Sequence, residues 1–138
     1  MDFFTALDIA ASGLSAQRTN MNVISMNLAN VQTTRTADGG PYQRKVVVFR
    51  SAPIKWPPDK VWLSELERQV KGVKVARIQT ENRPFRRVYD PNHPDADKDG
   101  YVLYPNINVV EEMANLLTAL RTYEANFCLL YTSPSPRD

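Results

Sequence analysis

The first thirty residues carry an apolar repeat that is typical of a long helix. Leucine or methionine recurs every seventh residue, and a second apolar set follows at the complementary heptad position, with Gln17 as its polar exception. No proline occurs before Pro41, so nothing in this stretch interrupts a helix. The repeat predicts one helix from Asp2 to about Val31, with an apolar seam that needs a partner. The two lines of the seam are Leu7, Leu14, Met21 and Leu28, and Phe3, Ala10, Ile24 and Val31.

A second repeat of the same kind lies near the other end of the chain. It predicts a helix from about Asn108 to Leu130. Asn106 or Asn108 could cap its start, and Glu111 and Glu112 in the first turns suit the helix dipole. Its heptad lines are Val109, Leu116, Tyr123 and Leu130, and Met113, Leu120 and Phe127.

Either stripe alone could be the core face of an ordinary amphipathic helix. Two such stripes, one at each end, favour an α+β fold in which the terminal helices pair as an antiparallel coiled coil around a small β-rich insertion. The expected boundaries are 1–31 and 107–131 for the helical domain, 32–106 for the β-rich middle and 132–138 for a disordered tail. We expect the first leucine line to face Met113, Leu116, Leu120, Tyr123 or Phe127.

The middle of the chain is predicted to form strands and loops. Residues 45–50 are typical of a strand. In residues 72–80 the apolar positions alternate up to Val75 and then change face at Ala76, which indicates either a bulge or a strand buried on both sides. The segment around Trp62 could be one helical turn or part of a strand. The prolines after it predict a succession of turns up to the second helix.

Charge is unevenly distributed along the 138 residues. Residues 35–90 contain 13 basic and six acidic residues, whereas residues 91–138 contain three basic and seven acidic ones. This asymmetry suits head-to-tail contacts between subunits, and a solvated surface with uneven charge would explain it equally well. The overall charge of +2 is too near balance to indicate nucleic acid or a membrane surface as a partner.

The composition also limits which kinds of site and which classes of protein are possible. The single cysteine excludes an internal disulfide, and one cysteine with one histidine leaves few ways to build a zinc site. Asp2 and Asp8 are unlike a cleaved secretory signal, and four asparagines between residues 19 and 34 make a poor membrane span. We therefore expect a soluble chain without membrane insertion.

One segment resembles a calcium site. Residues 95–100 match the first six positions of an EF-hand loop, but the twelfth position, which should be a bidentate glutamate, is Asn106. Pro94 and Pro105 also deny the loop its flanking helices. We predict exposed turn carboxylates at Asp95 and Asp97 and no metal site.

Other candidate chemistry is sparse, and no catalytic residue or cofactor site is predicted. His93 lies in a turn, and Cys128 is predicted to be a buried or semi-buried inert thiol on the second helix. Glu111 and Glu112 are adjacent on a helix and so point apart, which is wrong for an acid–base pair. A weak basic and aromatic cluster, with no nucleic-acid-binding fold to support it, consists of Arg83, Phe85, Arg86 and Arg87. The chain therefore has the features of an interaction or assembly protein.

Several motifs, in order along the chain, resemble those of the bacterial flagellar rod and hook proteins. The resemblance extends over about residues 3–127, which is nearly the whole chain, while residues 52–69 carry little of it. It rests on residues 6–18, 21–25, 27–30, 33–36, 39–45, 47–49, 88–97, 100–102, 105–106, 112–113 and 121–126. The family motifs include Ser12, Gly13, Leu14, Asn27, Leu28, Ala29, Asn30, Tyr123, Glu124, Ala125 and Asn126.

The resemblance implies a structural subunit of the proximal rod of the flagellar basal body, and not an enzyme. Proteins of this family pair their terminal helices, stack into the inner tube of a rod that crosses the periplasm, and transmit torque from motor to hook. The implied partners are other rod proteins, copies of itself and the flagellar type III apparatus, which exports the subunit unfolded and uncleaved. The alternative is a small calcium-binding or nucleic-acid-binding module.

The end of the chain departs from this resemblance. After Phe127 the family pattern continues as a helix for a few more turns, whereas Pro134 and Pro136 would end a helix here. Residues 128–138 resemble a foreign or frame-shifted tail. The seam then lacks its last turns, which predicts weaker assembly but an intact fold of the single subunit.

Overall fold

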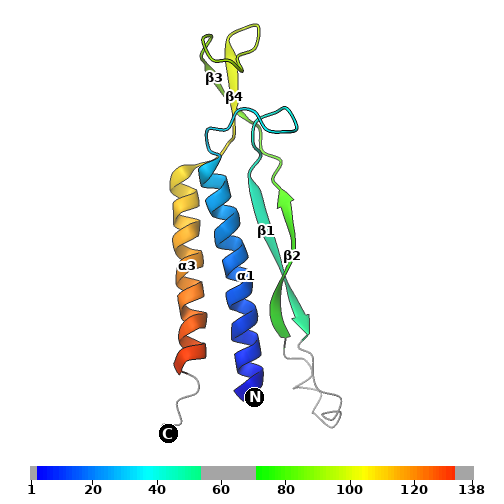
Figure 1. Cartoon of the computed structure of the whole chain (residues 1–138), viewed down its shortest axis with the longest axis vertical. Coiled ribbons are helices and arrows are strands. Elements are labelled where there is room, and N and C mark those ends of the chain that lie inside the picture. Colours follow the sequence, from blue (N-terminus) through cyan, green and yellow to red (C-terminus); the bar gives the residue numbers. More distant parts are fainter. Residues whose placement is uncertain (1–2, 54–70, 133–138) are drawn as a thin grey trace.

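The computed structural model describes residues 3–53 and 71–132. Two long helices, α1 and α3, run antiparallel side by side, and the β1–β2 hairpin lies along α1 (Figure 1). The β3–β4 hairpin extends beyond one end of the helix pair (Figure 1). This arrangement confirms the α+β prediction with paired terminal helices. The elements in chain order are α1 (Phe3–Ala29), β1 (Lys45–Pro53), β2 (Lys71–Thr80), β3 (Arg86–Tyr89), β4 (Tyr101–Tyr104) and α3 (Val109–Thr132).

The bounds of both helices agree with the sequence prediction to within two residues. The side-chain oxygen of Asn108 accepts hydrogen bonds from the backbone N–H groups of Val110, at 3.0 Å, and Glu111, at 3.3 Å. Asn108 is therefore the N-cap of α3, and the alternative at Asn106 is wrong. The helix is described as far as Thr132.

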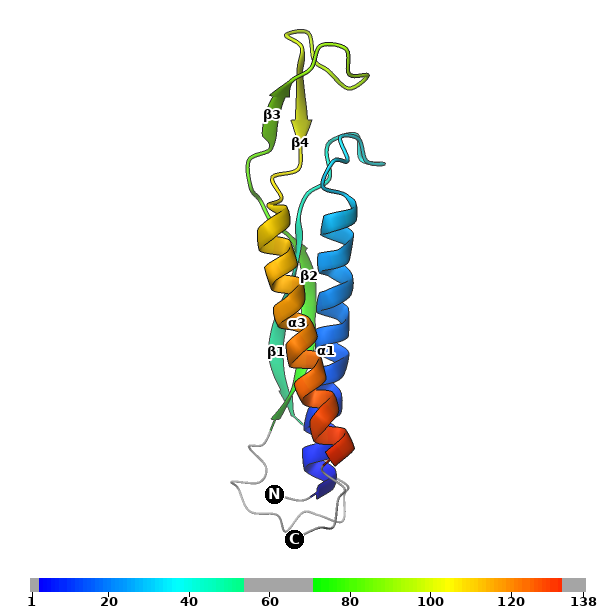
Figure 2. The ribbon, with the colours of Figure 1, turned by 90° about the vertical axis from the view of Figure 1, so that its left-hand side faces the viewer.

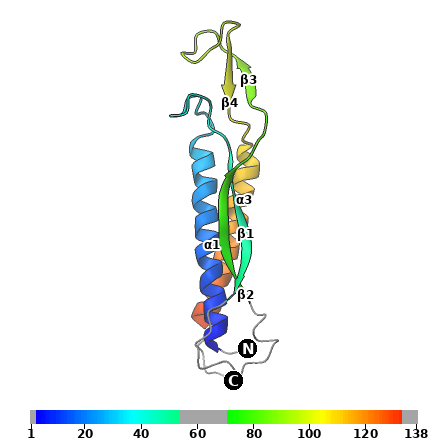
Figure 3. The ribbon, with the colours of Figure 1, turned by 90° about the vertical axis from the view of Figure 1, so that its right-hand side faces the viewer.

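α1 lies between α3 and the β1–β2 hairpin in the view of Figure 1, and in the two views turned by 90° it stands to one side of them (Figures 2 and 3). It packs against α3 and also against both strands of the β1–β2 hairpin. One direct link is a 3.0 Å hydrogen bond from the backbone N–H of Val73 on β2 to the hydroxyl of Ser12. Among the described residues, no helix has both the length and the apolar character needed to span a membrane.

The β1–β2 hairpin contains the bulge that the sequence indicated. Val48 pairs with Arg77 and Phe49 pairs with Val75, so Ala76 is the extra residue on β2. The side chains therefore change face at Ala76, as the apolar pattern does. The alternative, a strand buried on both sides, is wrong because most of β2 is exposed. The segment around Trp62 lies outside the described residues.

The β3–β4 hairpin was not predicted from the sequence, which indicated only turns in this region. Its four-residue strands pair from Arg86 opposite Tyr104 to Tyr89 opposite Tyr101. Strands this short give little alternation to detect. Arg87 lies over the ring of Tyr101, with 4.4 Å between the guanidinium carbon and the ring centroid, and so stabilises the hairpin across its strands.

Gly100 provides a test of this hairpin. Its φ of 85° lies in the left-handed region, and a Cβ there would stand 2.9 Å from the ring of Tyr89. We expect Gly100→Ala to lower the free energy of unfolding by about 1–3 kcal/mol, measured by urea denaturation. Gly40→Ala is the control, because Gly40 has no atom near its Cβ position and no positive φ. Equal effects of the two variants would contradict the strained geometry.

Candidate assembly surface

Small side chains bring α1 and α3 close together. A Cβ placed on Gly13 would stand 3.0 Å from the side-chain amide of Asn126. Ala10 and Ala16 on α1 and Ala119 on α3 are all nearly inaccessible to solvent. The inner line of α3 therefore consists of residues spaced by seven, Glu112, Ala119 and Asn126, and two of these are polar.

The predicted seam residues do not all lie at this contact. On α1, Ile24 is buried, and the leucine line with Met21 is half-buried. On α3, Leu116 and Tyr123 are half-buried. The other predicted line is exposed and so is not the packing line within the subunit, since Met113, Leu120 and Phe127 are 59%, 42% and 53% exposed. The half-buried members of the α1 seam are Leu7, Leu14, Met21 and Leu28.

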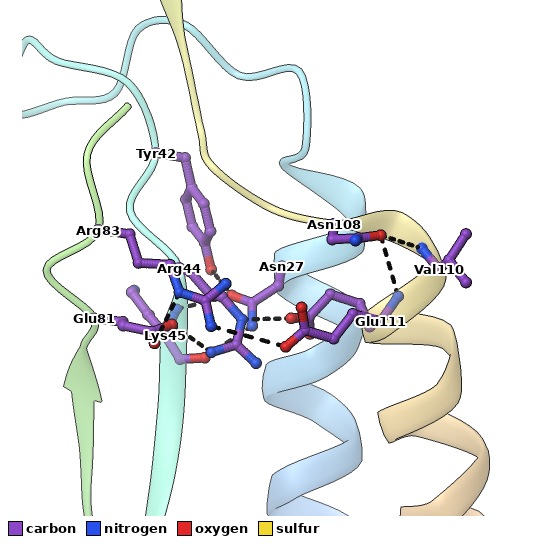
Figure 4. A network of polar contacts seen from close by, with 10 residues as sticks. Asn27, Tyr42, Arg44, Lys45, Glu81, Arg83, Asn108, Val110 and Glu111 are labelled. Carbon is purple, nitrogen blue, oxygen red and sulfur yellow. Dashed lines mark hydrogen bonds and ion pairs between the residues drawn. The ribbon is translucent and has the colours of Figure 1, made fainter. Parts of the chain in front are cut away.

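Asn27 joins the C-terminal end of α1 to the start of β1. Its side chain is 1% exposed, and its amide nitrogen donates to the carbonyl of Lys45 at 2.8 Å. Its amide oxygen accepts from the backbone N–H of Lys45, at 3.0 Å, and from the hydroxyl of Tyr42, at 2.9 Å. One buried amide thus fixes where β1 departs from the helix (Figure 4).

Arg44 connects three parts of the chain. Its Nε donates to Glu112 on α3, and its terminal nitrogen donates to Glu81 just after β2, at 2.5 Å. Arg83 lies 2.9 Å from the other oxygen of Glu81. We call the group formed by Asn27, Tyr42, Arg44, Glu81 and Glu112 the Arg44 clasp (Figure 4).

The electrostatics of the clasp follow from its burial. Desolvation acts to lower the pKa of Arg44, but the hydrogen bonds and charges of Glu112 and Glu81 outweigh it and raise that pKa. Desolvation acts to raise the pKa of Glu81, but the hydrogen bond and the charge of Arg44 outweigh it. The pKa of Glu81 is therefore lowered. Burial, and then the charge of Glu112, raises the pKa of Tyr42. The second oxygen of Glu112 is buried and has no hydrogen-bond partner.

The lowered pKa of Glu81 predicts a pH dependence. A carboxylate with a lowered folded-state pKa contributes stability above its unfolded pKa, about 4.3, and loses it as the pH falls through the folded value. We expect wild type to be more stable than Glu81→Gln at pH 7, and this difference to shrink below about pH 4. Urea unfolding at several pH values tests this, with the exposed Asp99→Asn as control. A difference that stays constant down to pH 2 would contradict it.

The loop that resembles a calcium site is used within the fold. Asp95 accepts a 2.6 Å hydrogen bond from the hydroxyl of Thr34 and pairs with Arg35 at 2.5 Å, and the first of these contacts is the larger cause of its lowered pKa. It therefore docks this loop onto the α1–β1 connection instead of being only an exposed turn residue. Asp97 is exposed and accepts two backbone hydrogen bonds at 2.9 Å, as a turn residue does. No cluster of potential metal ligands occurs among residues 3–53 and 71–132.

The structure also gives the positions of His93 and Cys128. The Nδ1 of His93 accepts a 3.0 Å hydrogen bond from the backbone N–H of Asp95, which gives it a structural position in the turn. Cys128 is exposed, so the prediction of a buried or semi-buried thiol is wrong. Its neighbours Phe127 and Leu129 are apolar, but this side of α3 faces away from α1.

Within residues 3–53 and 71–132, the outward side of α3 carries the largest run of exposed apolar side chains at regular spacing. Val110 and Leu117, at one heptad position, are 76% and 50% exposed. The other heptad position is the predicted line of Met113, Leu120 and Phe127, which is also exposed. We call Val110, Met113, Leu117, Leu120 and Phe127 the α3 stripe. Such a stripe is typical of an interaction surface, because single subunits rarely leave this much aligned apolar area in water.

Similarity to known proteins agrees with these features. Residues 7–35 match the family described as "Flagella basal body rod protein", and residues 98–130 match "Flagellar basal body rod FlgEFG protein C-terminal". The flagellar basal-body rod protein FlgC of Borreliella burgdorferi is 43% identical, over 98% of this chain and 93% of its own length. The chain belongs to the FlgC family. FlgC of Aquifex aeolicus is 43% identical over 91% of this chain and 85% of its own, and that of Salmonella typhimurium 39% over 98% and 92%.

FlgC membership makes the chain a structural subunit of the flagellar basal-body rod. The two matched regions cover most of α1 and α3, which are the paired helices of the structure. The clasp residues Tyr42, Arg44 and Glu81 were not predicted as a site. The sequence held one indication for Glu112, because this charged residue lies seven positions before Ala119 and so on the same line of the helix.

Proposed function

We propose that this subunit occupies the proximal rod, where it transmits torque from motor to hook and catalyses no reaction. It contacts other rod proteins and copies of itself through its terminal helices. The single observation that carries this proposal is the α3 stripe, which the antiparallel partner α1 leaves uncovered. A mechanical element needs such lateral contacts, because a single helix pair cannot carry torque alone.

The proposal includes export as an unfolded, uncleaved chain through the flagellar type III apparatus, to a rod that spans the periplasm. The small core supports it. The apolar residues buried in the described part are largely alanine and valine, so little apolar area opposes unfolding. Burial against neighbouring subunits would then complete the stability after export.

Complementation tests the proposal directly. In a motile bacterium without its own FlgC, this chain and a version with a family-like ending restored after Phe127 should be exported alike, but only the restored version should give full swimming. The restored version is therefore the background for the substitutions. We expect Met113→Glu with Leu117→Glu to be exported equally well and to abolish swimming, while Arg121→Glu, an exposed change on the same helix, retains it. Swimming by the doubly substituted chain would show that the stripe has no part in the rod.

The alternative, a calcium-binding or nucleic-acid-binding module, has no observation in its favour. Asp95 already pairs with Thr34 and Arg35. Arg86 and Arg87 lie over tyrosine rings of the β3–β4 hairpin. We expect no shift in the melting temperature on adding calcium, with wild type or with Asp97→Asn. A calcium-dependent rise of several degrees in wild type would revive the alternative.

A further inference from the structure

The side of α1 that faces away from the core has an unusual composition. Each heptad position along this line, from Phe4 to Ala29, is exposed. Most of its side chains are small or polar, and Arg18 stands near its centre. The line begins with Phe4 and Asp8 and continues with Ala11, Ser15, Arg18, Asn22, Ser25 and Ala29.

The α3 stripe has the complementary composition. Its side chains are large and apolar, and Glu124 occupies the heptad position between Leu120 and Phe127. Glu124 is exposed, as is Arg18 on α1. Neither of these two charged groups pairs with another residue in the part of the chain that the structure describes.

We propose that the α3 stripe of one copy packs antiparallel onto the outer line of α1 of a second copy, in the register that brings Glu124 to Arg18. The register follows from the spacing. Antiparallel heptads align only in steps of seven residues, and this step places each large side chain opposite a small or polar one. The resulting layers join Phe127 with Ser15, Leu120 with Asn22, Leu117 with Ser25 and Met113 with Ala29.

The neighbouring registers are unfavourable. A shift of seven residues one way places Glu124 opposite Ala11 and Arg18 opposite Leu117, and the other way places Glu124 opposite Ser25. Each shift leaves both charges in the seam without a partner, which costs far more than a surface charge. The Glu124–Arg18 layer therefore selects one register, as a single polar layer does in coiled coils.

The occupant is a second copy because the two faces lie on the same chain and are complementary in size and charge. They are also different surfaces, so the contact is heterologous and leaves one face free on each end copy. Repeating it adds subunits side by side instead of closing a dimer. This inference rests on the proposed rod function and specifies the contact that it requires.

Charge reversal tests the contact in the full chain. By sedimentation velocity, Arg18→Glu and Glu124→Arg should each weaken self-association by about tenfold or more, and the double variant should return to within about threefold of wild type. Arg121→Glu, on α3 but off the stripe, should leave self-association unchanged. A wild-type chain that stays monomeric at every concentration, or a double variant no better than the single ones, would overturn the proposal.

Disulfide trapping tests the register. In a Cys128→Ser background, Ser25→Cys with Leu117→Cys should give a ladder of linked subunits on a non-reducing gel, because these positions face one another between copies. Ser25→Cys with Val110→Cys, one heptad out of register, should not. A chain that restores swimming without the ladder keeps the rod function and overturns this contact. A ladder from a chain that does not restore swimming even with a family-like ending after Phe127 keeps the contact and counts against the rod function.

Discussion

Arg44→Ala should lower the free energy of unfolding by about 3–5 kcal/mol. The reason is that the substitution leaves the carboxylate of Glu112 without its ion-pair partner. Glu112 is 1% exposed, and one of its oxygens already lacks a partner, so loss of the guanidinium leaves a buried charge with no compensation. Urea denaturation at pH 7, followed by circular dichroism, gives the measurement.

Two further variants separate this cause from general damage. Arg83→Ala removes an arginine of the same network whose side chain is 34% exposed, and we expect a cost of about 1 kcal/mol or less. Arg44→Met with Glu112→Leu removes both charges and should recover most of the stability lost in Arg44→Ala. Equal losses for Arg44→Ala and Arg83→Ala would mean that Glu112 reaches water in solution.

The sequence predicted the two helices and their antiparallel pairing because each signal is local. Four heptads without proline identify α1, and an asparagine at 106 or 108 with the acidic first turn indicates the start of α3, where the structure selects Asn108. The bulge in β2 was also visible, since one inserted residue reverses every later side chain. Such patterns depend only on neighbours along the chain, and tertiary contacts did not override them.

The packing line of α3 could not be found in this way. The heptad rule selects large apolar residues, and so it favoured Met113, Leu120 and Phe127. The structure instead packs the helices through Gly13, Ala119 and Asn126, because small residues allow a closer approach of the backbones. A stripe of large residues therefore has two possible uses, within the subunit or between subunits, and the sequence pattern is the same for both.

The Arg44 clasp was hidden for a different reason. Arg44 and Glu112 are separated by 68 residues, and their pairing depends on where β1 leaves α1. That departure is set by the amide of Asn27, which the sequence showed only as part of a family motif. A long-range polar network of this kind has no periodicity, so only the fold reveals it.

Asn27→Ala should cost about 3–5 kcal/mol of unfolding free energy. The amide makes three hydrogen bonds, and its loss strands both backbone groups of Lys45 and the hydroxyl of Tyr42 in a buried site, at about 1–3 kcal/mol for each unpaired group. Tyr42→Phe removes one of these bonds and should cost about 1 kcal/mol. Asn106→Ala, an exposed asparagine in the β4–α3 connection, should change stability by about 0.5 kcal/mol or less. The order of the three values in urea denaturation is the decisive result. If Asn27→Ala costs no more than Tyr42→Phe, the backbone of Lys45 finds other partners, and β1 does not depend on this amide for its position beside α1.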